Sequence, residues 1–376
     1  MKFKINKDEF YGAINTASRA ISPNGPTQAL NGLKIDVSTD EISIVGSNAV
    51  TSIEITLRAD DENVNLVVDE PGTIVVDAKY LLDIVKKLDN DVVSVEIIDG
   101  TLTHFAGNKA NFNINGYRPK DYPLITFVKK AITFDLDYET LVDMCGKLTF
   151  ACSNRDSRPV LMGVNFSSDG SKITCVATDS YRLAKKTLPM ATESFNVTVP
   201  AKSLNEIKSV FKPEDSIRVS VDNREMMFYS DGRILKTTLL EGNYPDVGHL
   251  IPTSFSNYII VNRSVLMAAI DRATFLKTDG ISVIHLDIAP GKDIILSSKS
   301  SEIGDFNEPI PAVLGNDEEM RVSFIGTYIV DALKTLETDM VRISFNTNLK
   351  PFIIRNDDTG GDQDLLQLVL PIRTYD

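Results

Sequence analysis

The densest group of chemically versatile residues is the run TDSYR at 178–182, which places three hydroxyls, one of them phenolic, beside a carboxylate and a cation. A polar active site could use such a group for nucleophilic attack or proton transfer. The sequence has only three histidines, His104, His249 and His285, and none lies near the run to act as its base. One hypothesis is therefore an enzyme with this cluster as its active site. The hypotheses set against it are non-catalytic.

Signatures of common catalytic and metal sites are missing from the sequence. It contains no GxxxxGK[ST] phosphate loop, no GxGxxG fingerprint and no GxSxG nucleophile elbow. It also lacks HExxH and CxxC, so we expect neither a metal nor a cofactor. The sparse set of Cys145, Cys152 and Cys175 is typical of buried core residues in a reducing compartment, which predicts a cytoplasmic protein.

Length and composition are those of a soluble globular protein with two or three domains. The chain has 376 residues, of which 43% are hydrophobic and 24% charged. No apolar run approaches the roughly 18 residues that span a bilayer, so no membrane association is expected. The net charge of −13 argues, taken alone, against nucleic-acid binding, although an acidic shell can surround a local basic lining.

One pattern recurs three times and predicts repeated domains. Runs starting at Phe3, Phe134 and Ile259 alternate apolar residues with others, as a strand does, and then reach Asn or Asp followed by a helical pattern. A second strand-then-helix pattern recurs inside each repeat, near residues 75, 197 and 323. The sequence thus predicts six half-units with one amphipathic helix each, in the windows 7–20, 78–88, 137–151, 201–212, 262–277 and 327–337.

Short alternating runs between these helices indicate antiparallel strands and hairpins, so the predicted class is α+β. Tyr122-Pro123 and Tyr244-Pro245 each stand just before a new repeat. We therefore predict three domains of one kind, at residues 1–126, 127–252 and 253–376.

Three motifs in this order resemble the bacterial DNA sliding clamp family, the β subunit of the DNA polymerase III holoenzyme. They are VATDSYRLA at 176–184, YPD at 244–246 and LVLPIR at 368–373. The resemblance covers the whole chain. It implies three tandem clamp domains per chain and a head-to-tail dimer ring, with helices lining the hole and sheets forming the outer wall.

The resemblance also implies a non-catalytic function, that of a DNA polymerase processivity factor. The ring would encircle duplex DNA and slide on it without sequence specificity, through a weak basic lining. Candidate DNA-facing residues on the predicted helices are Lys79, Lys86, Lys87, Lys202, Lys208, Arg263, Arg272 and Lys277. The remaining alternative is a structural repeat protein with no role on DNA.

Family members bind the replicative polymerase, the clamp loader and repair proteins in a hydrophobic groove, through short motifs with a Gln and a terminal Leu–Phe pair. The matching positions here are Leu161, Thr178, Ser180, Tyr181, Arg182, Leu183, Pro245, His249, Leu250, Ile325, Tyr328, Leu349, Pro351, Leu368, Val369, Leu370, Pro371, Ile372 and Arg373. Several of these leucines could equally be core residues. Ile325 departs from the family, which often has Asn there. The apolar tail is expected to dock as a strand rather than fray.

Ring closure, as the resemblance implies it, pairs an edge strand of the first domain with a helix end of the third. The matching residues are Phe112 and Ile114 on the run 111–114, and Phe275 and Leu276 at the end of the 262–277 helix. The alternative for Phe112 and Ile114 is that they fill the core of their own domain.

Overall fold

The structure is a computed structural model that describes residues 1–22, 27–277, 280–315, 319–357 and 364–373. None of the helices in these ranges combines the length and the apolar character that crossing a bilayer requires.

The described chain repeats one arrangement six times, a strand and a helix followed by three strands. The two half-units of the first repeat are β1 (Lys2–Asn6), α1 (Lys7–Ser18), β2 (Gly32–Val37), β3 (Glu41–Ser47), β4 (Thr51–Arg58), and β6 (Gly72–Asp77), α2 (Ala78–Lys87), β7 (Val92–Asp99), β8 (Leu102–Ala106), β9 (Asn111–Asn115). Those of the second are β10 (Ile132–Asp137), α3 (Tyr138–Leu148), β11 (Gly163–Ser168), β12 (Lys172–Thr178), β13 (Arg182–Pro189), and β14 (Phe195–Pro200), α4 (Ala201–Val210), β15 (Ser216–Val221), β16 (Glu225–Ser230), β17 (Arg233–Thr238). Those of the third are β18 (Asn257–Asn262), α5 (Arg263–Ala273), β19 (Val283–Ile288), β20 (Ile294–Ser300), β21 (Gly304–Ile310), and β23 (Met320–Ile325), α6 (Gly326–Lys334), β24 (Met340–Phe345), β25 (Phe352–Asn356), β26 (Leu365–Val369). Two short strands, β5 (Val67–Glu70) and β22 (Ala312–Gly315), are additions to this scheme. The prediction of six half-units is confirmed.

The first helix of each repeat starts where the sequence predicts a cap. Asn6, Asp137 and Asn262 each accept a hydrogen bond from the backbone N–H three residues further on, at 3.1, 2.8 and 3.1 Å. Such a bond satisfies one of the donors that a helix start leaves free. These residues therefore fix where the preceding strand ends and the helix begins.

The helices end earlier than the sequence windows do. The 262–277 window was too long, because α5 ends at Ala273 and the N–H of Thr274 closes its last turn. Phe275, Leu276 and Lys277 lie beyond the helix, so their prediction as helical residues was wrong. The amphipathic pattern continues past the end because Leu276 is buried against its own domain, although it is no longer helical.

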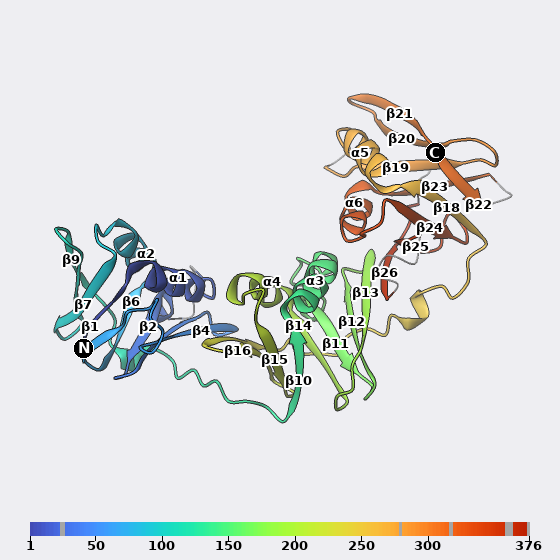
Figure 1. Ribbon diagram of the computed structural model, residues 1–376. Helices are drawn as coiled ribbons and strands as arrows, with labels where there is room; N and C mark the ends of the chain where they lie inside the picture. Colours follow the sequence, from blue (N-terminus) through green and yellow to red (C-terminus); the bar gives the residue numbers. More distant parts are fainter. Residues whose placement is uncertain (23–26, 278–279, 316–318, 358–363, 374–376) are drawn as a thin grey trace. The chain divides into compact units, whose positions relative to one another are not determined.

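The strands form four antiparallel sheets in two compact units (Figure 1). Residues 1–142 with 202–239 hold the sheets β5-β1-β7-β8-β9 and β10-β15-β16-β17-β4-β3-β2-β6. Residues 143–201 with 240–376 hold the sheets β14-β11-β12-β13-β26-β25-β24-β18-β22 and β21-β20-β19-β23. Strands from different repeats thus share a sheet, and the boundaries near 126 and 252 stay predictions.

In the first unit, a strand of one repeat pairs with a strand of the next. β4 pairs antiparallel with β17, with Ile53 opposite Leu235. Buried hydroxyls support the pairing, because Ser203 lies 2.6 Å from Thr51 and 2.8 Å from Thr237. We call this pairing and its supporting contacts the β4–β17 joint.

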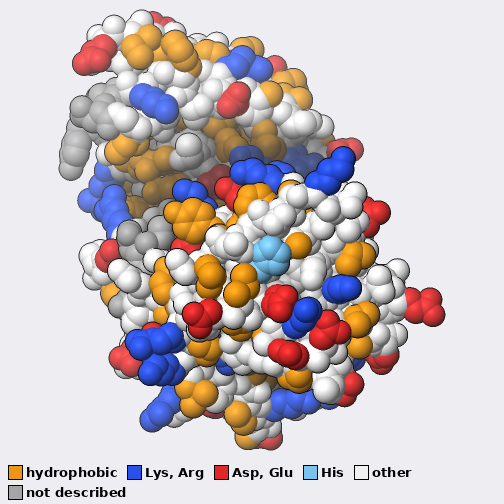
Figure 2. Space-filling view, turned by 90° about the vertical axis from the view of Figure 1, so that its left-hand side faces the viewer, with side chains coloured by type: hydrophobic (Ala, Val, Ile, Leu, Met, Phe, Trp, Pro, Cys, Tyr) orange, Lys and Arg blue, Asp and Glu red, His pale blue; other side chains and the backbone are white. Residues whose placement is uncertain are grey.

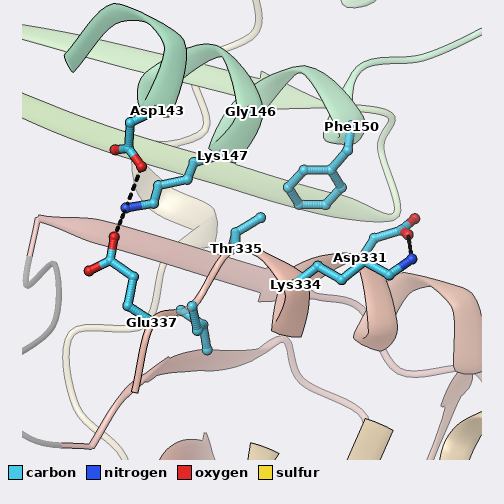
Figure 3. Close-up of a pocket in the computed structure, with 9 residues that line it drawn as sticks. Asp143, Gly146, Lys147, Phe150, Asp331, Lys334, Thr335 and Glu337 are labelled. Atoms are coloured by element: carbon cyan, nitrogen blue, oxygen red, sulfur yellow. Dashed lines mark hydrogen bonds and ion pairs between the residues drawn. The ribbon is translucent and has the colours of Figure 1, made fainter. Parts of the chain in front are cut away.

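The second unit contains an equivalent joint between β13 and β26, here called the β13–β26 joint. The register runs from Arg182 opposite Val369 to Lys186 opposite Leu365. Beside it, the buried Lys147 binds Asp143 of its own helix at 2.8 Å and reaches Glu337 beyond α6, as Figure 3 shows.

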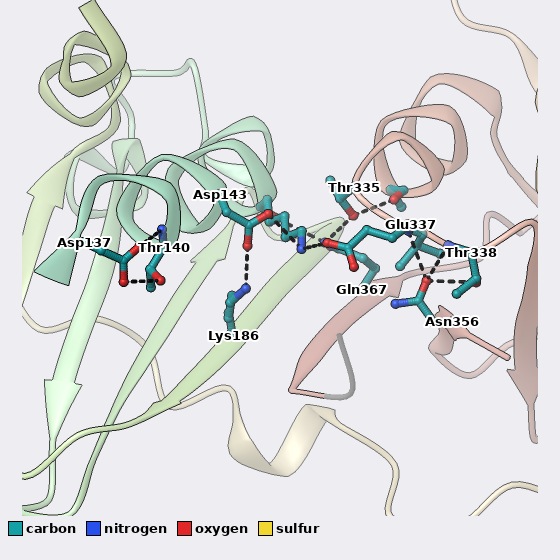
Figure 4. Close-up of polar contacts among 12 residues, drawn as sticks. Asp137, Thr140, Asp143, Lys186, Thr335, Glu337, Thr338, Asn356 and Gln367 are labelled. Atoms are coloured by element: carbon teal, nitrogen blue, oxygen red, sulfur yellow. Dashed lines mark hydrogen bonds and ion pairs between the residues drawn. The ribbon is translucent and has the colours of Figure 1, made fainter. Parts of the chain in front are cut away.

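A second buried lysine of this joint completes the polar network. Lys186 binds the other carboxylate oxygen of Asp143 at 2.6 Å (Figure 4). Gln367 of β26 donates to the carbonyl of Lys147 at 3.2 Å and to the hydroxyl of Thr335 at 3.0 Å. A buried lysine is tolerated where carboxylates surround it, and removing one partner would leave an uncompensated charge. The network therefore fixes α3 to the segment that follows α6.

Candidate functional site

The polar run that begins the sequence argument forms the turn between β12 and β13. Ser180 has φ of +79°, a left-handed conformation that the surrounding bonds hold in place. Asp179 accepts from the N–H groups of Tyr181 and Arg182 at 2.9 and 3.0 Å. Thr178 donates its hydroxyl to the carbonyl of Arg182 at 2.6 Å. The carboxylate and this hydroxyl thus stabilise a turn, which weakens the hypothesis that they carry out catalysis.

Arg182 ties this turn to α6. Its guanidinium binds Asp179 at 3.0 Å and Asp331 of α6 at 2.7 Å. It also lies over the rings of Tyr328 and Phe150, at 4.6 and 5.2 Å from their centroids. A planar cation between two carboxylates and two aromatic faces is held in one orientation. Arg182 is therefore a positioning residue of the site, with little of its charge left for a ligand.

Two tyrosines form an aromatic wall next to Arg182. The rings of Tyr181 and Tyr328 stack with centroids 6.5 Å apart and planes 27° apart. Tyr181 is 52% exposed, whereas partial burial raises the pKa of Tyr328 above its ordinary value. An exposed ring stacked on a partly buried one is suited to packing against an apolar or aromatic side chain.

Two cavities meet at this wall. One, of about 410 Å³, is lined by Leu161, Ser180 and Arg182 among others. The other, of about 910 Å³, is lined by Ile325 and Ile372 among others. Both include Arg155, Tyr181 and Tyr328. Because the two cavities share these three residues, we describe them together as the tyrosine groove.

The chain end docks beside the tyrosine groove, as its apolar composition predicts. The N–H of Leu370 donates to the carbonyl of Tyr181 at 2.9 Å. The N–H of Ile372 donates to the carbonyl of Ser323 at 2.7 Å. Pro371, between them, has no N–H to leave unpaired. The tail is thereby fixed to residues of two different repeats.

Apolar residues beneath the turn form a small core of their own. Leu183, Val247 and Leu368 pack together with Val176, Ile353 and Leu366. Tyr244 and Leu370 cover this cluster and are only partly buried. Burial raises the pKa of Tyr244, and its hydroxyl oxygen has no hydrogen-bond partner among the described residues. The cluster thus joins the strands on either side of the turn, β12 and β13, to β25 and β26.

The predicted groove residues fall into three sets. Leu161, Leu183, Leu368 and Val369 are buried, so at most they form its floor. Thr178, Ser180, Tyr181, Arg182, Ile325, Tyr328, Leu370, Pro371 and Ile372 belong to the tyrosine groove or to the turn and tail beside it. Pro245, His249, Leu250, Leu349, Pro351 and Arg373 line neither cavity, and Leu250 and Leu349 are 44% and 56% exposed.

Sequence reasoning missed several groove residues. Arg155, Phe150, Ile281 and Asp331 contribute to the walls or hold Arg182 in place. None belongs to a recognisable motif, and Ile281 lies 100 positions after Tyr181 of the turn. Only long-range strand pairing brings these residues together, so no local signal could have identified them.

The predicted DNA-facing residues occupy different environments. Lys79, Lys86 and Lys87 are exposed on α2, and Lys202 and Lys208 are exposed on α4. Arg263 is partly buried and donates to the carbonyl of Leu336 at 2.9 Å, and Arg272 pairs with Glu308 at 2.5 Å. Figure 2 shows basic side chains interspersed with acidic and apolar ones on the face that it displays. The lysines of α2 and α4 are thus exposed to solvent, whereas Arg263 and Arg272 are bound to groups of their own domain.

Comparison with known proteins gives one consistent result. Family models of the DNA polymerase III beta subunit match its N-terminal domain at residues 1–126, its central domain at 135–246 and its C-terminal domain at 248–373. The chain is 35% identical to the beta sliding clamp of Bacillus subtilis (strain 168) and 33% identical to that of Staphylococcus aureus (strain N315), with both chains fully covered. The crystal structure of the Bacillus subtilis sliding clamp matches with a TM-score of 0.94, 34% identity and full coverage of both chains. That of the beta chain from Streptococcus pneumoniae TIGR4 matches with a TM-score of 0.94 and 32% identity, over 99% of this chain and 100% of the other.

Proposed function

Because the chain belongs to the family of DNA polymerase III beta subunits, the beta sliding clamps, which are processivity factors of DNA replication, we propose that two copies close head to tail into a ring around duplex DNA. The ring is non-catalytic, acts in the cytoplasm and slides without reading sequence. It tethers the replicative polymerase, the clamp loader and repair proteins through the tyrosine groove.

The observation that carries the ring is the way in which the repeats join within one chain. At both joints, the last strand of a first half-unit pairs with the last strand of a second half-unit of the next repeat. These strands are β4 and β17 in one joint, and β13 and β26 in the other. By the same rule, β21 and β9 should pair, and each is an edge strand in a single chain.

Joining β9 of one copy to β21 of another would reproduce a sheet that already exists. In the combined sheet, the strands β1-β7-β8-β9 would be followed by β21-β20-β19-β23. An existing sheet has the order β10-β15-β16-β17 followed by β4-β3-β2-β6. In both, the same strands of the half-units stand at the same places. An unpaired edge exposes a row of N–H and C=O groups that a second strand can satisfy. Since each copy carries one edge of each kind, contacts of this heterologous type can close into a ring.

Exposed apolar side chains near these edges support the same closure. Phe275, just beyond α5, is 74% exposed, while Phe112 and Ile114 on β9 are half-buried. Leu276 is 7% exposed, so it supports Phe275 from within its own domain rather than meeting a partner. Burying one phenylalanine side chain contributes roughly 1.5–3 kcal/mol to association.

Weak DNA contact suits a ring that holds DNA topologically. Exposed lysines on α2 and α4 can neutralise phosphates without contacting base edges. The excess of acidic residues elsewhere, with a net charge of −13, disfavours DNA outside the hole.

The test combines native mass with retention on DNA. We expect a dimer by analytical ultracentrifugation, retained on nicked circular DNA after loading and lost when that DNA is linearised. Phe275→Asp should yield folded monomers without retention. Val67→Asp, at a 52% exposed position on β5, the opposite edge from β9, is the matched control and should stay dimeric. A wild-type protein that is monomeric, or equally retained on linear DNA, would refute the ring.

A further inference from the structure

The repeats determine which residues of β9 and β21 would face each other where two copies join. In the β4–β17 joint, Ser52 is opposite Lys236. In the β13–β26 joint, Leu183 is opposite Leu368. A third joint with the same geometry must bring together the residues of β21 and β9 that correspond to these pairs.

The residue of β9 that corresponds to Lys236 and Leu368 is Asn113. One backbone hydrogen bond recurs in each repeat, from the N–H groups of Tyr117, Leu240 and Ile372 to the carbonyls of Val75, Thr198 and Ser323, at 2.7, 2.9 and 2.7 Å. Each of these carbonyls belongs to the residue three positions before the second helix of its repeat. Counting back four positions from each donor leads to Asn113, Lys236 and Leu368.

The residue of β21 that corresponds to Ser52 and Leu183 is Asp305. The residues just before α2, α4 and α6 are opposite Gly32, Gly163 and Val283. Two positions further on, the next strand is reached by the pairs Lys34–Val45, Asn165–Val176 and His285–Ser297. Two positions beyond these, the last strand is reached by the pairs Ser47–Ser52, Thr178–Leu183 and Lys299–Asp305.

Contacts with the helices support this equivalence of β13 and β21. Lys186, three positions after Leu183, binds Asp143 of α3 at 2.6 Å. Glu308, three positions after Asp305, binds Arg272 of α5 at 2.5 Å. Since α3 and α5 are the first helices of their repeats, both strands meet the helix in the same register.

The side chains of Asn113 and Asp305 are prepared for a contact with each other. Both are exposed in the single chain. Nδ1 of His104, the residue opposite Asn113 on β8, lies 2.6 Å from the amide oxygen of Asn113. Because an amide oxygen can only accept, His104 donates, and the amide NH₂ group is left for the open side of β9. The Asp305 carboxylate makes neither a hydrogen bond nor an ion pair with any residue that the structure describes.

We infer that Asn113 of one copy and Asp305 of the other stand directly opposite each other in the ring, and that the Asn113 amide donates to the Asp305 carboxylate. The inference rests on the proposed function, since it assigns a contact to the proposed joint. Directly opposite side chains have Cβ atoms about 4.5–5.5 Å apart, within reach of such a bond. A slip by one residue would place Asp305 opposite the apolar Phe112 or Ile114, so the bond fixes the register in which the ring closes.

The experiment measures the dissociation constant of the dimer by analytical ultracentrifugation. Asn113→Asp would place two carboxylates opposite each other, and since a ring contains two such joints, the dimer should weaken about tenfold. Adding Asp305→Asn exchanges the two side chains and should restore the constant to about the wild-type value. The matched control is Asn111→Asp, on the same face of β9, because the same register places it opposite the neutral Asn307. It should weaken the dimer less than Asn113→Asp does, and Asp305→Asn should not correct it.

Two failures can be told apart. If the wild type is a dimer and Asn113→Asp weakens it no more than Asn111→Asp, or Asp305→Asn fails to correct Asn113→Asp, the inference is wrong and the ring stands. If the wild type is monomeric, or Phe275→Asp leaves the dimer intact, the proposed joint itself is wrong and the inference falls with it.

Discussion

Removing the Arg182 side chain should loosen the whole groove, because this side chain connects its parts. Arg182→Ala takes away the ion pairs with Asp179 and Asp331 and the contacts with the rings of Tyr328 and Phe150. The guanidinium is 13% exposed and the Asp179 carboxylate 14%, so solvent screens their pair little. The Asp331 side chain is 34% exposed, so the free energy of its ion pair with Arg182 must be reduced for screening by solvent.

The expected loss can be estimated from these contacts. A hydrogen bond to a charged group contributes about 1.5–3 kcal/mol, a more exposed ion pair about 0–1, and a cation over an aromatic ring about 0.5–1. These contributions do not simply add, because all the contacts share the Arg182 side chain. We expect Arg182→Ala to lower the free energy of local opening by about 3 kcal/mol. Arg182→Lys keeps the charge but loses the planar fork and the stacking, so it should lose about half of that.

Hydrogen–deuterium exchange measures this local opening directly. The amides of Leu370 and Ile372, which bind the carbonyls of Tyr181 and Ser323, are the probes. Arg182→Ala should speed their exchange about a hundredfold, and Arg182→Lys about tenfold, because about 1.4 kcal/mol corresponds to a factor of ten. Lys172→Ala, which removes an exposed ion pair from β12, should leave it unchanged. Exchange of Arg182→Ala within threefold of wild type would refute the idea that this side chain holds the groove together.

Three further outcomes follow from the structure. Deleting residues 370–376 should abolish binding of a Leu–Phe peptide while leaving the dimer intact by sedimentation, and binding of wild-type strength would locate the groove elsewhere. Reversing the charge of Lys202 and Lys208 should shorten retention on circular DNA, and unchanged lifetimes at low salt would exclude an electrostatic lining by α4. Burial raises the pKa of Cys145 and Cys152 from 9.0 to about 12, so the unfolded chain loses these protons first. The free energy of unfolding in urea should therefore fall as the pH rises from 9 towards 12, and a double Cys→Ala variant should show a shallower fall.

The repeated half-units could be predicted because their signals are local. A cap such as Asn6 or Asn262 marks the change from strand to helix within a few residues, and the apolar stripe of α2 follows a helical period. The end of α5 could not be placed in this way, because the buried Leu276 extends the apolar pattern beyond the helix. Periodicity reports burial, and here burial continues where the helix has ended.

The joints were beyond local prediction because they depend on partners far apart in the chain. Nothing around Lys147 or Lys186 indicates that both are buried, since a lysine is normally exposed. Their burial depends on Asp143 on their own side of the joint and on Glu337 across it. The sheets could be predicted as antiparallel hairpins, but their continuation from one repeat into the next could not.

The tyrosine groove and the β13–β26 joint are one structure, and this explains why the chain end carries so much of the site. β26 supplies Leu368 to the apolar cluster around the turn, and the residues directly after it bind Tyr181 on one side and Ser323 on the other. The pairing that unites the two repeats therefore also positions the walls of both cavities. A substitution that separates β26 from β13 should remove peptide binding even if every wall residue is intact. Conversely, a peptide seated across the groove contacts both repeats, so it should stabilise the joint by RT ln(1 + [L]/Kd), where [L] is the concentration of free peptide.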